Sequence, residues 1–130
     1  MTDSLFEHPV HLGPGGHAVQ EPVFTGDMDW YAAYGIRHMD DGFEGRLVSI
    51  HTFSKPWSSW EVHPNGHEVV VCTNGEITLI QEIEGEEHRS ILRAGTYAIN
   101  APGVWHTADV SGSATALFIT AGVGTQQRPR

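Results

Sequence analysis

Residues 60–75 read Trp-Glu-Val-His-Pro-Asn-Gly-His-Glu-Val-Val-Val-Cys-Thr-Asn-Gly, and this stretch decides the fold. In an extended strand, side chains two positions apart point to the same face, so Glu61 and His63 project together. The Pro-Asn-Gly that follows predicts a turn, because proline fixes φ and the other two residues tolerate the left-handed region. We expect the chain to return as a second strand with Glu68 across the ladder from Glu61 and His63. Three possible metal ligands then converge beside one turn.

A second segment, residues 95–106, supplies a further ligand. It reads Gly-Thr-Tyr-Ala-Ile-Asn-Ala-Pro-Gly-Val-Trp-His, so a strand ends at an Ala-Pro-Gly turn and His106 follows. Glu61, His63, Glu68 and His106 together make two imidazoles and two carboxylates, which would neutralise a divalent ion. Such a mixed nitrogen and oxygen set suits Mn, Fe(II), Ni or Zn better than it suits a soft thiolate metal.

These two segments resemble the cupin family. Its first motif runs Gly, five residues, His-x-His, three or four residues, Glu, six residues, Gly, and its second runs Gly, five residues, Pro-x-Gly, two residues, His, three residues, Asn. The resemblance covers residues 47–121, and the matched positions are His63, Glu68, Gly75, Gly95, Gly103 and His106. The departures are Lys55 for the leading Gly, Glu61 for the first His, Ala101 for the Pro and Val110 for the Asn. The resemblance implies an all-β fold, the cupin-type double-stranded β-helix or jelly-roll barrel.

The glutamate in place of the first motif histidine leaves two alternatives. Either Glu61, His63, Glu68 and His106 bind a metal, or they form a buried hydrogen-bond network in a metal-free jelly roll. Two carboxylates buried without a cation are costly, because each raises the pKa of the other, and this favours the metal. Glu61 is then either a ligand or a catalytic base. His51 is the other candidate for proton transfer, unless it is a hydrogen-bonded wall residue.

The chain is expected to form one domain with additions at both ends. Residues 1–44 predict an N-terminal arm and a short helix, capped by Asp27, that pack on the barrel or on a partner subunit. The aromatic stripe of this helix, Trp30, Tyr31 and Tyr34, is interpreted as packing. The histidines of the arm, His8, His11 and His17, are interpreted as loop residues rather than as a metal-binding tract. Residues 45–123 predict the cupin barrel, and residues 124–130 predict a frayed C-terminal tail.

Turn signals and single residues complete the expected barrel. Asn74-Gly75 is the strongest hairpin signal of the chain, and Glu84-Gly85 predicts another hairpin tip. Cys72 is interpreted as a buried structural thiol rather than a nucleophile. The three tryptophans that flank the ligand segments would either stack on a sugar ring or serve packing and a dimer interface: Trp57, Trp60 and Trp105.

Composition limits the partners. Lys and Arg number 7 against 16 Asp and Glu, and the formal net charge of −9 argues against nucleic acid and against an anionic membrane surface. With 1 cysteine and without a signal peptide or a long apolar run, a reducing cytoplasm is the expected location. The cupin resemblance and the N-terminal arm predict a homodimer, and a small molecule is the expected ligand.

The leading functional hypothesis is a small metal-binding cupin that acts as a metal-dependent enzyme on a small oxygenated molecule. The cupin resemblance implies dioxygenase, isomerase or lyase chemistry on sugars, sugar acids, diketones or phenolic compounds, and the sequence does not select among them. The alternative is a non-catalytic binding module for a sugar-like molecule, in which the barrel is metal-free or holds a structural metal. A structural or interaction protein also stays open, because a fold does not decide a function.

Overall fold

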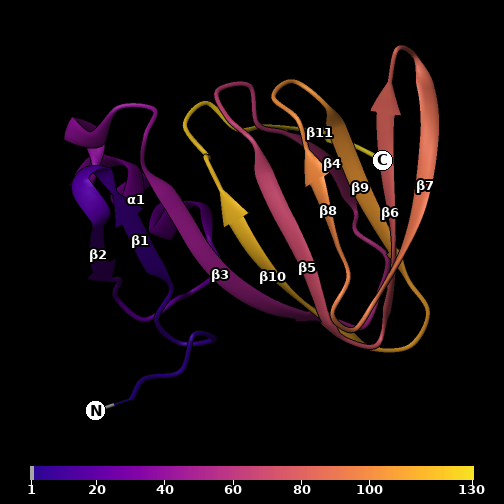
Figure 1. Ribbon diagram of the computed structural model, residues 1–130, viewed down its shortest axis with the longest axis horizontal. Coiled ribbons are helices and arrows are strands. Elements are labelled where there is room, and N and C mark those ends of the chain that lie inside the picture. Colours follow the sequence, from indigo (N-terminus) through magenta and orange to yellow (C-terminus); the bar gives the residue numbers. More distant parts are fainter. Residues whose placement is uncertain (1) are drawn as a thin grey trace.

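The computed structural model describes residues 2–130, and its strands form two antiparallel sheets that enclose one core (Figure 1). The elements are β1 (Val10–Gly13), η1 (Pro14–Gly16), β2 (His17–Gln20), α1 (Met28–Arg37), η2 (Met39–Asp41), β3 (Arg46–Phe53), β4 (Ser59–Val62), β5 (Glu68–Asn74), β6 (Glu76–Ile83), β7 (Glu86–Arg93), β8 (Tyr97–Asn100), β9 (Trp105–Val110), β10 (Ala114–Thr120) and β11 (Gln126–Pro129). The six-stranded sheet has the order β2-β1-β3-β10-β5-β8, and the five-stranded sheet has the order β11-β4-β9-β6-β7. The all-β prediction is confirmed.

Side chains from both sheets fill the space between them. Val70 and Cys72 of β5 and Phe118 of β10 meet Leu79 of β6 and Ala108 of β9, and all of them are buried. Strand alternation explains this arrangement, because every second residue of these strands is apolar and points inward. Cys72 is fully buried and burial raises its pKa, as expected for a structural thiol.

Two predicted hairpins are wrong, because their strands lie in different sheets. The turn before His67 joins β4 of the five-stranded sheet to β5 of the six-stranded sheet, and the Asn74-Gly75 turn joins β5 back to β6. Both turns therefore cross between sheets. Gly75 has φ 75°, and a side chain there would collide with the backbone of Ser113 and Ala114. The hairpin at Glu84-Gly85 is real, since β6 and β7 pair on either side of it.

The N-terminal region contributes strands that the sequence did not reveal. β1 and β2 form a hairpin, and β1 pairs with β3, so the six-stranded sheet is extended by this chain's own residues. Four-residue strands interrupted by Pro and Gly carry too short an alternation to be recognised. α1 begins as expected, because the Asp27 carboxylate accepts a hydrogen bond from the Trp30 N–H at 2.8 Å. Among residues 2–130, no helix is long and apolar enough to cross a membrane.

The prediction of a frayed C-terminal tail is wrong. β11 pairs with β4 and forms the edge of the five-stranded sheet. The Arg128 guanidinium lies 5.2 Å from the Trp60 ring and 4.5 Å from the Trp105 ring, and it forms an ion pair with Glu82 at 2.6 Å. These contacts hold the strand in place, and they assign Trp60 and Trp105 to packing rather than to a sugar site.

Candidate metal centre

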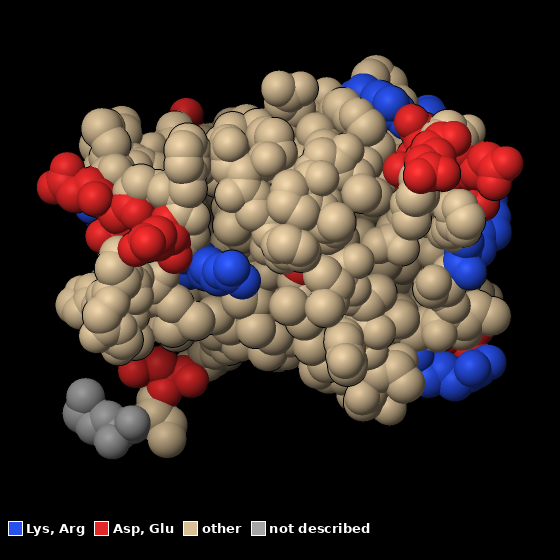
Figure 2. All heavy atoms as spheres, turned by 45° about the horizontal axis from the view of Figure 1, so that its top comes forward, with Lys and Arg blue, Asp and Glu red and all other residues tan. Residues whose placement is uncertain are grey.

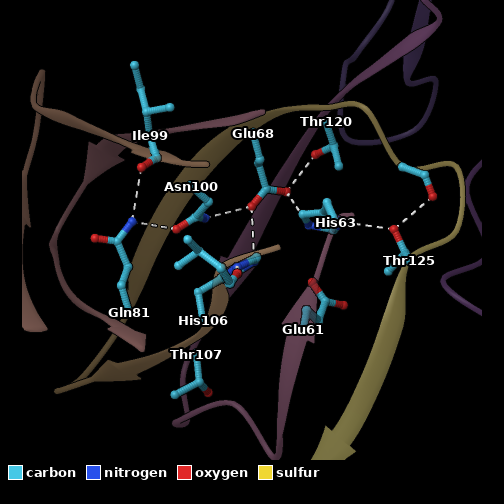
Figure 3. A network of polar contacts seen from close by, with 12 residues as sticks. Glu61, His63, Glu68, Gln81, Ile99, Asn100, His106, Thr107, Thr120 and Thr125 are labelled. Atoms are coloured by element: carbon cyan, nitrogen blue, oxygen red, sulfur yellow. Dashed lines mark hydrogen bonds and ion pairs between the residues drawn. The ribbon is translucent and has the colours of Figure 1, made fainter. Parts of the chain in front are cut away.

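Three of the predicted ligands come together at one end of the five-stranded sheet. Glu61 of β4 lies directly opposite His106 of β9, and His63, two residues after Glu61, comes directly after the end of β4. One ligand atom from each of these three residues lies within 4.8 Å of the other two. His63 and His106 are buried, whereas Glu61 is half-buried. The two-residue spacing and the strand pairing therefore direct three potential ligands into one small volume (Figure 3).

Glu68 reaches the same place from the other sheet. Its Oε2 lies 3.1 Å from His63 Nε2, and its Oε1 lies 3.2 Å from His106 Nε2. The expectation of a ladder contact is wrong, because β5 pairs with β10 and β8 and Glu68 crosses the interior of the sandwich. The group within 4.8 Å does not include Glu68, but its carboxylate touches both imidazoles.

The hydrogen bonds of the two imidazoles define their tautomers. His106 Nδ1 lies 3.1 Å from the Val104 carbonyl, which can only accept, so this nitrogen carries the proton. His63 Nδ1 lies 2.8 Å from the Thr125 hydroxyl, which donates its own proton to the Gly122 carbonyl at 2.8 Å. His63 Nδ1 must therefore donate as well. In their neutral forms, both rings present an Nε2 lone pair to the interior.

These two lone pairs have no suitable partner among residues 2–130. Both Nε2 atoms are buried and neither makes a hydrogen bond, although the Glu68 oxygens are close. A protonated ring would pair with the Glu68 carboxylate, but when both rings are neutral each acceptor lone pair is repelled by the oxygen that it faces. A cation between them turns this repulsion into attraction. Metal-ligating histidines commonly donate their other ring N–H to a carbonyl or a second polar group, as His63 and His106 do here.

The distances also fit shared coordination. Two neighbouring ligands at about 2.1 Å from one octahedral ion are about 3.0 Å apart. The separations of 3.1 Å and 3.2 Å between the Glu68 oxygens and the imidazoles match this spacing. The donor set of two nitrogens and carboxylate oxygens suits a divalent transition metal.

Three further polar residues fix the Glu68 carboxylate. Asn100 Nδ2 donates to Oε1 at 3.0 Å, and the Thr120 hydroxyl donates to Oε2 at 2.6 Å. Gln81 Nε2 donates to Asn100 Oδ1 at 2.7 Å and so sets which way that amide points (Figure 3). Asn100 and Thr120 lie opposite Glu68 on the strands either side of β5.

The ionisation of the cluster follows from burial and pairing. Burial alone would raise the pKa of Glu68, but the contacts with His106 and His63 outweigh it and hold that pKa well below its usual value. Burial alone would lower the pKa of His106, but the Glu68 carboxylate raises it above its usual value. The carboxylate is thus ionised at neutral pH, as a metal ligand must be.

A cavity of about 1400 Å³ adjoins the cluster, with walls from α1, β3, β4 and the segment before β11. Glu61, His63 and Glu68 lie at its inner wall. Glu61 is held there by Gln127 of β11, whose Nε2 donates to Oε1 at 2.9 Å. Sequence reasoning missed both Gln127 and Thr125, because it assigned residues 124–130 to a frayed tail.

The structure places His51, the other predicted catalytic residue, in the wall of this cavity. Its ring packs against Phe24, Phe118 and Phe53 at 5.0, 5.8 and 6.2 Å between centroids. Burial lowers the pKa of His51, so its imidazole is neutral at pH 7. Tyr31 of α1 also lines the cavity. Its ring packs edge-on against Phe24 and Trp30, as interpreted from the sequence. Burial, and then the charges of Glu61 and Glu68, raise the pKa of Tyr31 to about 12, so its hydroxyl stays protonated at neutral pH.

A second cluster, His11, His38 and Asp41, has ligand-type atoms within 4.8 Å of one another. His11 is already bonded to the Tyr34 hydroxyl at 2.6 Å and to Asp41 at 2.5 Å, and His38 is bonded to Glu21 at 2.9 Å. The two imidazoles are stacked 3.6 Å apart at 11°. One ion at about 2 Å cannot lie in both ring planes, so this cluster is a polar network that fastens α1 to β1.

Comparisons with known proteins place this architecture among solved structures. No family model matches the sequence, and no curated protein has a similar sequence. A conserved protein with a double-stranded β-helix domain from Klebsiella pneumoniae shares 22% identity over 65% of this chain and 76% of that chain, with a TM-score of 0.54. A cupin-2 domain protein from Shewanella frigidimarina shares 16% sequence identity over 65% of this chain and 71% of that chain, with a TM-score of 0.50. Oxalate oxidase shares 16% over 62% of this chain, with a TM-score of 0.54, and only 44% of its own length is covered. Structural similarity at these low sequence identities shows only that the fold is shared.

Proposed function

We propose that this chain, whose fold is the cupin-type double-stranded β-helix, is a metal-dependent enzyme that acts on a small oxygenated molecule. The observation that carries the proposal is the pair of buried Nε2 atoms of His63 and His106, which face the Glu68 carboxylate without a hydrogen-bond partner. The proposed ligands are Glu61, His63, Glu68 and His106. The proposed ion is divalent Mn, Fe, Ni or Zn.

A bound divalent ion would supply a Lewis acid that polarises a substrate oxygen. The protein groups around it have separate proposed roles. Asn100 and Thr120 hold Glu68 in one orientation, and Thr125 holds His63. His51 is the proposed acid or base, because it is neutral, lines the cavity and makes no side-chain hydrogen bond within residues 2–130.

Glu61 has two compatible roles in this proposal. It is half-buried, lines the cavity and accepts one hydrogen bond from Gln127. A ligand position is favoured by its place within 4.8 Å of both imidazoles. A role as base requires that it leave the ion, so Glu61→Gln separates the two: loss of bound metal assigns a ligand, and retained metal with lost turnover assigns a base.

Elemental analysis of untagged protein tests the proposal. Wild type is expected to hold close to one equivalent of Mn, Fe, Ni or Zn, and His63→Ala and His106→Ala are expected to lose it. His88→Ala, an exposed histidine on β7, is the matched control and should retain the metal. Wild-type protein that holds no metal, even after loading, would contradict the proposal. A ligand that is bound and returned unchanged by the metal-loaded protein would instead favour the binding module.

We also propose that the protein works as a homodimer through the outer face of the six-stranded sheet. Two rows of apolar residues cross four neighbouring strands of this face in register, namely Ile50, Leu117, Val71 and Tyr97, and Val48, Ile119, Val69 and Ile99. In the view of Figure 2, charged side chains gather at the two ends of the molecule and the surface between them is almost free of charge. Two copies with a net charge of −9 each repel one another least where they meet through an uncharged face.

The size of this face is of the right order for a second copy. With about 4.8 Å between strands and about 3.3 Å per residue, four strands of the sheet present about 20 Å by about 20 Å. The flat projection of this face is therefore about 400 Å², about half of the 800 Å² or so that each partner of a stable dimer buries. Light scattering of wild type should give twice the mass of one chain, and light scattering of Val71→Asp should give the mass of a single chain. Ile83→Asp, on β6 of the other sheet, is the control. A wild-type mass equal to one chain overturns this proposal.

A further inference from the structure

The charges that line the cavity do not suit an anionic ligand. Three carboxylates and one lysine line it: Asp27, Glu61, Glu68 and Lys55. Lys55 and Asp27 are both exposed, so water and salt screen their charges, whereas Glu68 is buried. Within residues 2–130, no arginine lines the cavity. A divalent ion on Glu61 and Glu68 would be neutralised by them, and little positive charge would be left to attract a carboxylate.

The wall of the cavity is aromatic. Phe118 is its centre, with His51, Phe53 and Trp57 at 5.8, 6.0 and 6.1 Å between ring centroids. The Trp57 indole also lies edge-on to His106, at 6.4 Å. This wall extends from the metal cluster along β3. A ligand with a flat apolar ring would pack against it most favourably.

Two uncharged polar side chains that line the cavity, Tyr31 and His51, can donate or accept a hydrogen bond. The hydroxyl of Tyr31 stays protonated because burial and the two glutamates raise its pKa to about 12. The same negative field that protects this proton opposes a carboxylate in the cavity. His51 is neutral and is not engaged by another side chain of the described part of the chain.

We infer that the cavity selects an uncharged, ring-bearing molecule with a carbonyl or similar oxygen, and rejects carboxylates such as sugar acids or oxalate. The inference rests on the proposed function for the place of that oxygen, next to Glu61, His63 and His106. The ring packs against Phe118 and its aromatic neighbours. Without the ion, the preference for a neutral ligand comes from the charges of Glu61 and Glu68; with the ion bound, these two carboxylates neutralise it and leave little charge to attract an anion.

The test compares benzamide with benzoate, which have nearly the same shape and differ in charge. NMR shift titrations of the 14.2 kDa protein measure both, in the Zn²⁺-loaded and in the metal-free form. Benzamide should bind at least about tenfold more tightly than benzoate in the metal-free form, because a carboxylate meets like charges there, and by a smaller factor in the Zn²⁺-loaded form, where the ion neutralises those charges. Equal or tighter binding of benzoate overturns the inference, and so does the lack of saturable benzamide binding up to its solubility.

An arginine introduced at the mouth of the cavity tests whether the charge of the cavity causes the preference for benzamide over benzoate. Val123 lines the cavity and is 49% exposed, so Val123→Arg can be made without disturbing the core. It should tighten benzoate at least about threefold and leave benzamide unchanged within about twofold. Ile91→Arg, at an exposed position of β7, is the control and should change the affinity for neither benzoate nor benzamide. If no metal loads but benzamide selectivity remains, the proposed enzyme fails and the neutral cavity stands. If metal loads and benzoate is preferred, only this inference fails.

Discussion

Replacing Thr125 with valine removes the hydrogen-bond partner of His63, one of the proposed metal ligands. The valine side chain has nearly the same shape, but it cannot accept the proton of His63 Nδ1 at 2.8 Å. His63 is 5% exposed, so water has limited access to this N–H. Loss of such a partner typically costs about 10-fold to 100-fold in metal affinity. Because Thr125 itself is exposed and a water molecule can partly replace its hydroxyl, we expect the lower end, about tenfold or about 1.4 kcal/mol.

Competition with a chromophoric chelator for Zn²⁺ measures this difference. Thr73→Val is the matched control, because Thr73 is also exposed and its hydroxyl donates one hydrogen bond, to the Thr115 carbonyl at 3.2 Å, outside the cavity. The control should bind Zn²⁺ as wild type does. Equal Zn²⁺ affinity of wild type and Thr125→Val, with both variants folded by circular dichroism, would refute the assignment of the His63 tautomer and its role.

Three further outcomes test other parts of the structure. Removing the metal with a chelator should lower the thermal unfolding midpoint by about 10 °C, because an ion at about a hundredfold its Kd contributes about 2.7 kcal/mol; an unchanged midpoint in calorimetry contradicts a bound ion. His51 has a lowered pKa when folded, so its protonation below about pH 6.5 favours the unfolded chain, and the stability contributed by this residue is lost as pH falls. Urea titrations at pH 7 and pH 5 should show that His51→Gln loses less unfolding free energy than wild type, and an equal loss argues for a solvated imidazole. Arg128→Ala should cost about 1–2 kcal/mol in urea unfolding and also weaken Zn²⁺ binding, since β11 carries contacts to Glu61; stability equal to wild type would mean that the strand is held by backbone pairing alone.

The residues of the centre were predictable from local pattern, but the paths of the chain between them were not. Alternation placed Glu61 and His63 on one face, and the structure brings a ligand atom of each within 4.8 Å of His106, while Glu68 contacts His63 and His106. The sequence of a Pro-Asn-Gly or Asn-Gly turn is the same whether the following strand pairs with the preceding strand or crosses to the other sheet. The choice depends on pairing with distant strands such as β10, which no local signal contains.

The supporting residues had no signal that sequence reasoning could use. Asn100 and Thr120 are ordinary strand residues, and they matter only because they flank Glu68 in the sheet. The C-terminal segment is polar and lacks apolar alternation, so it resembled an unstructured tail. Its order comes from Arg128 between two tryptophans that lie far away in sequence.

β11 also sets an order of events during folding. It pairs with β4 across more than sixty residues, as Gln127 opposite Glu61 illustrates, and long-range pairing of this kind forms slowly. Before β11 docks, His63 lacks its hydrogen-bond acceptor and Glu61 lacks its amide partner. We therefore expect a folding chain to bind metal weakly until β11 docks. Metal loading would then report that the last strand of the five-stranded sheet is in place.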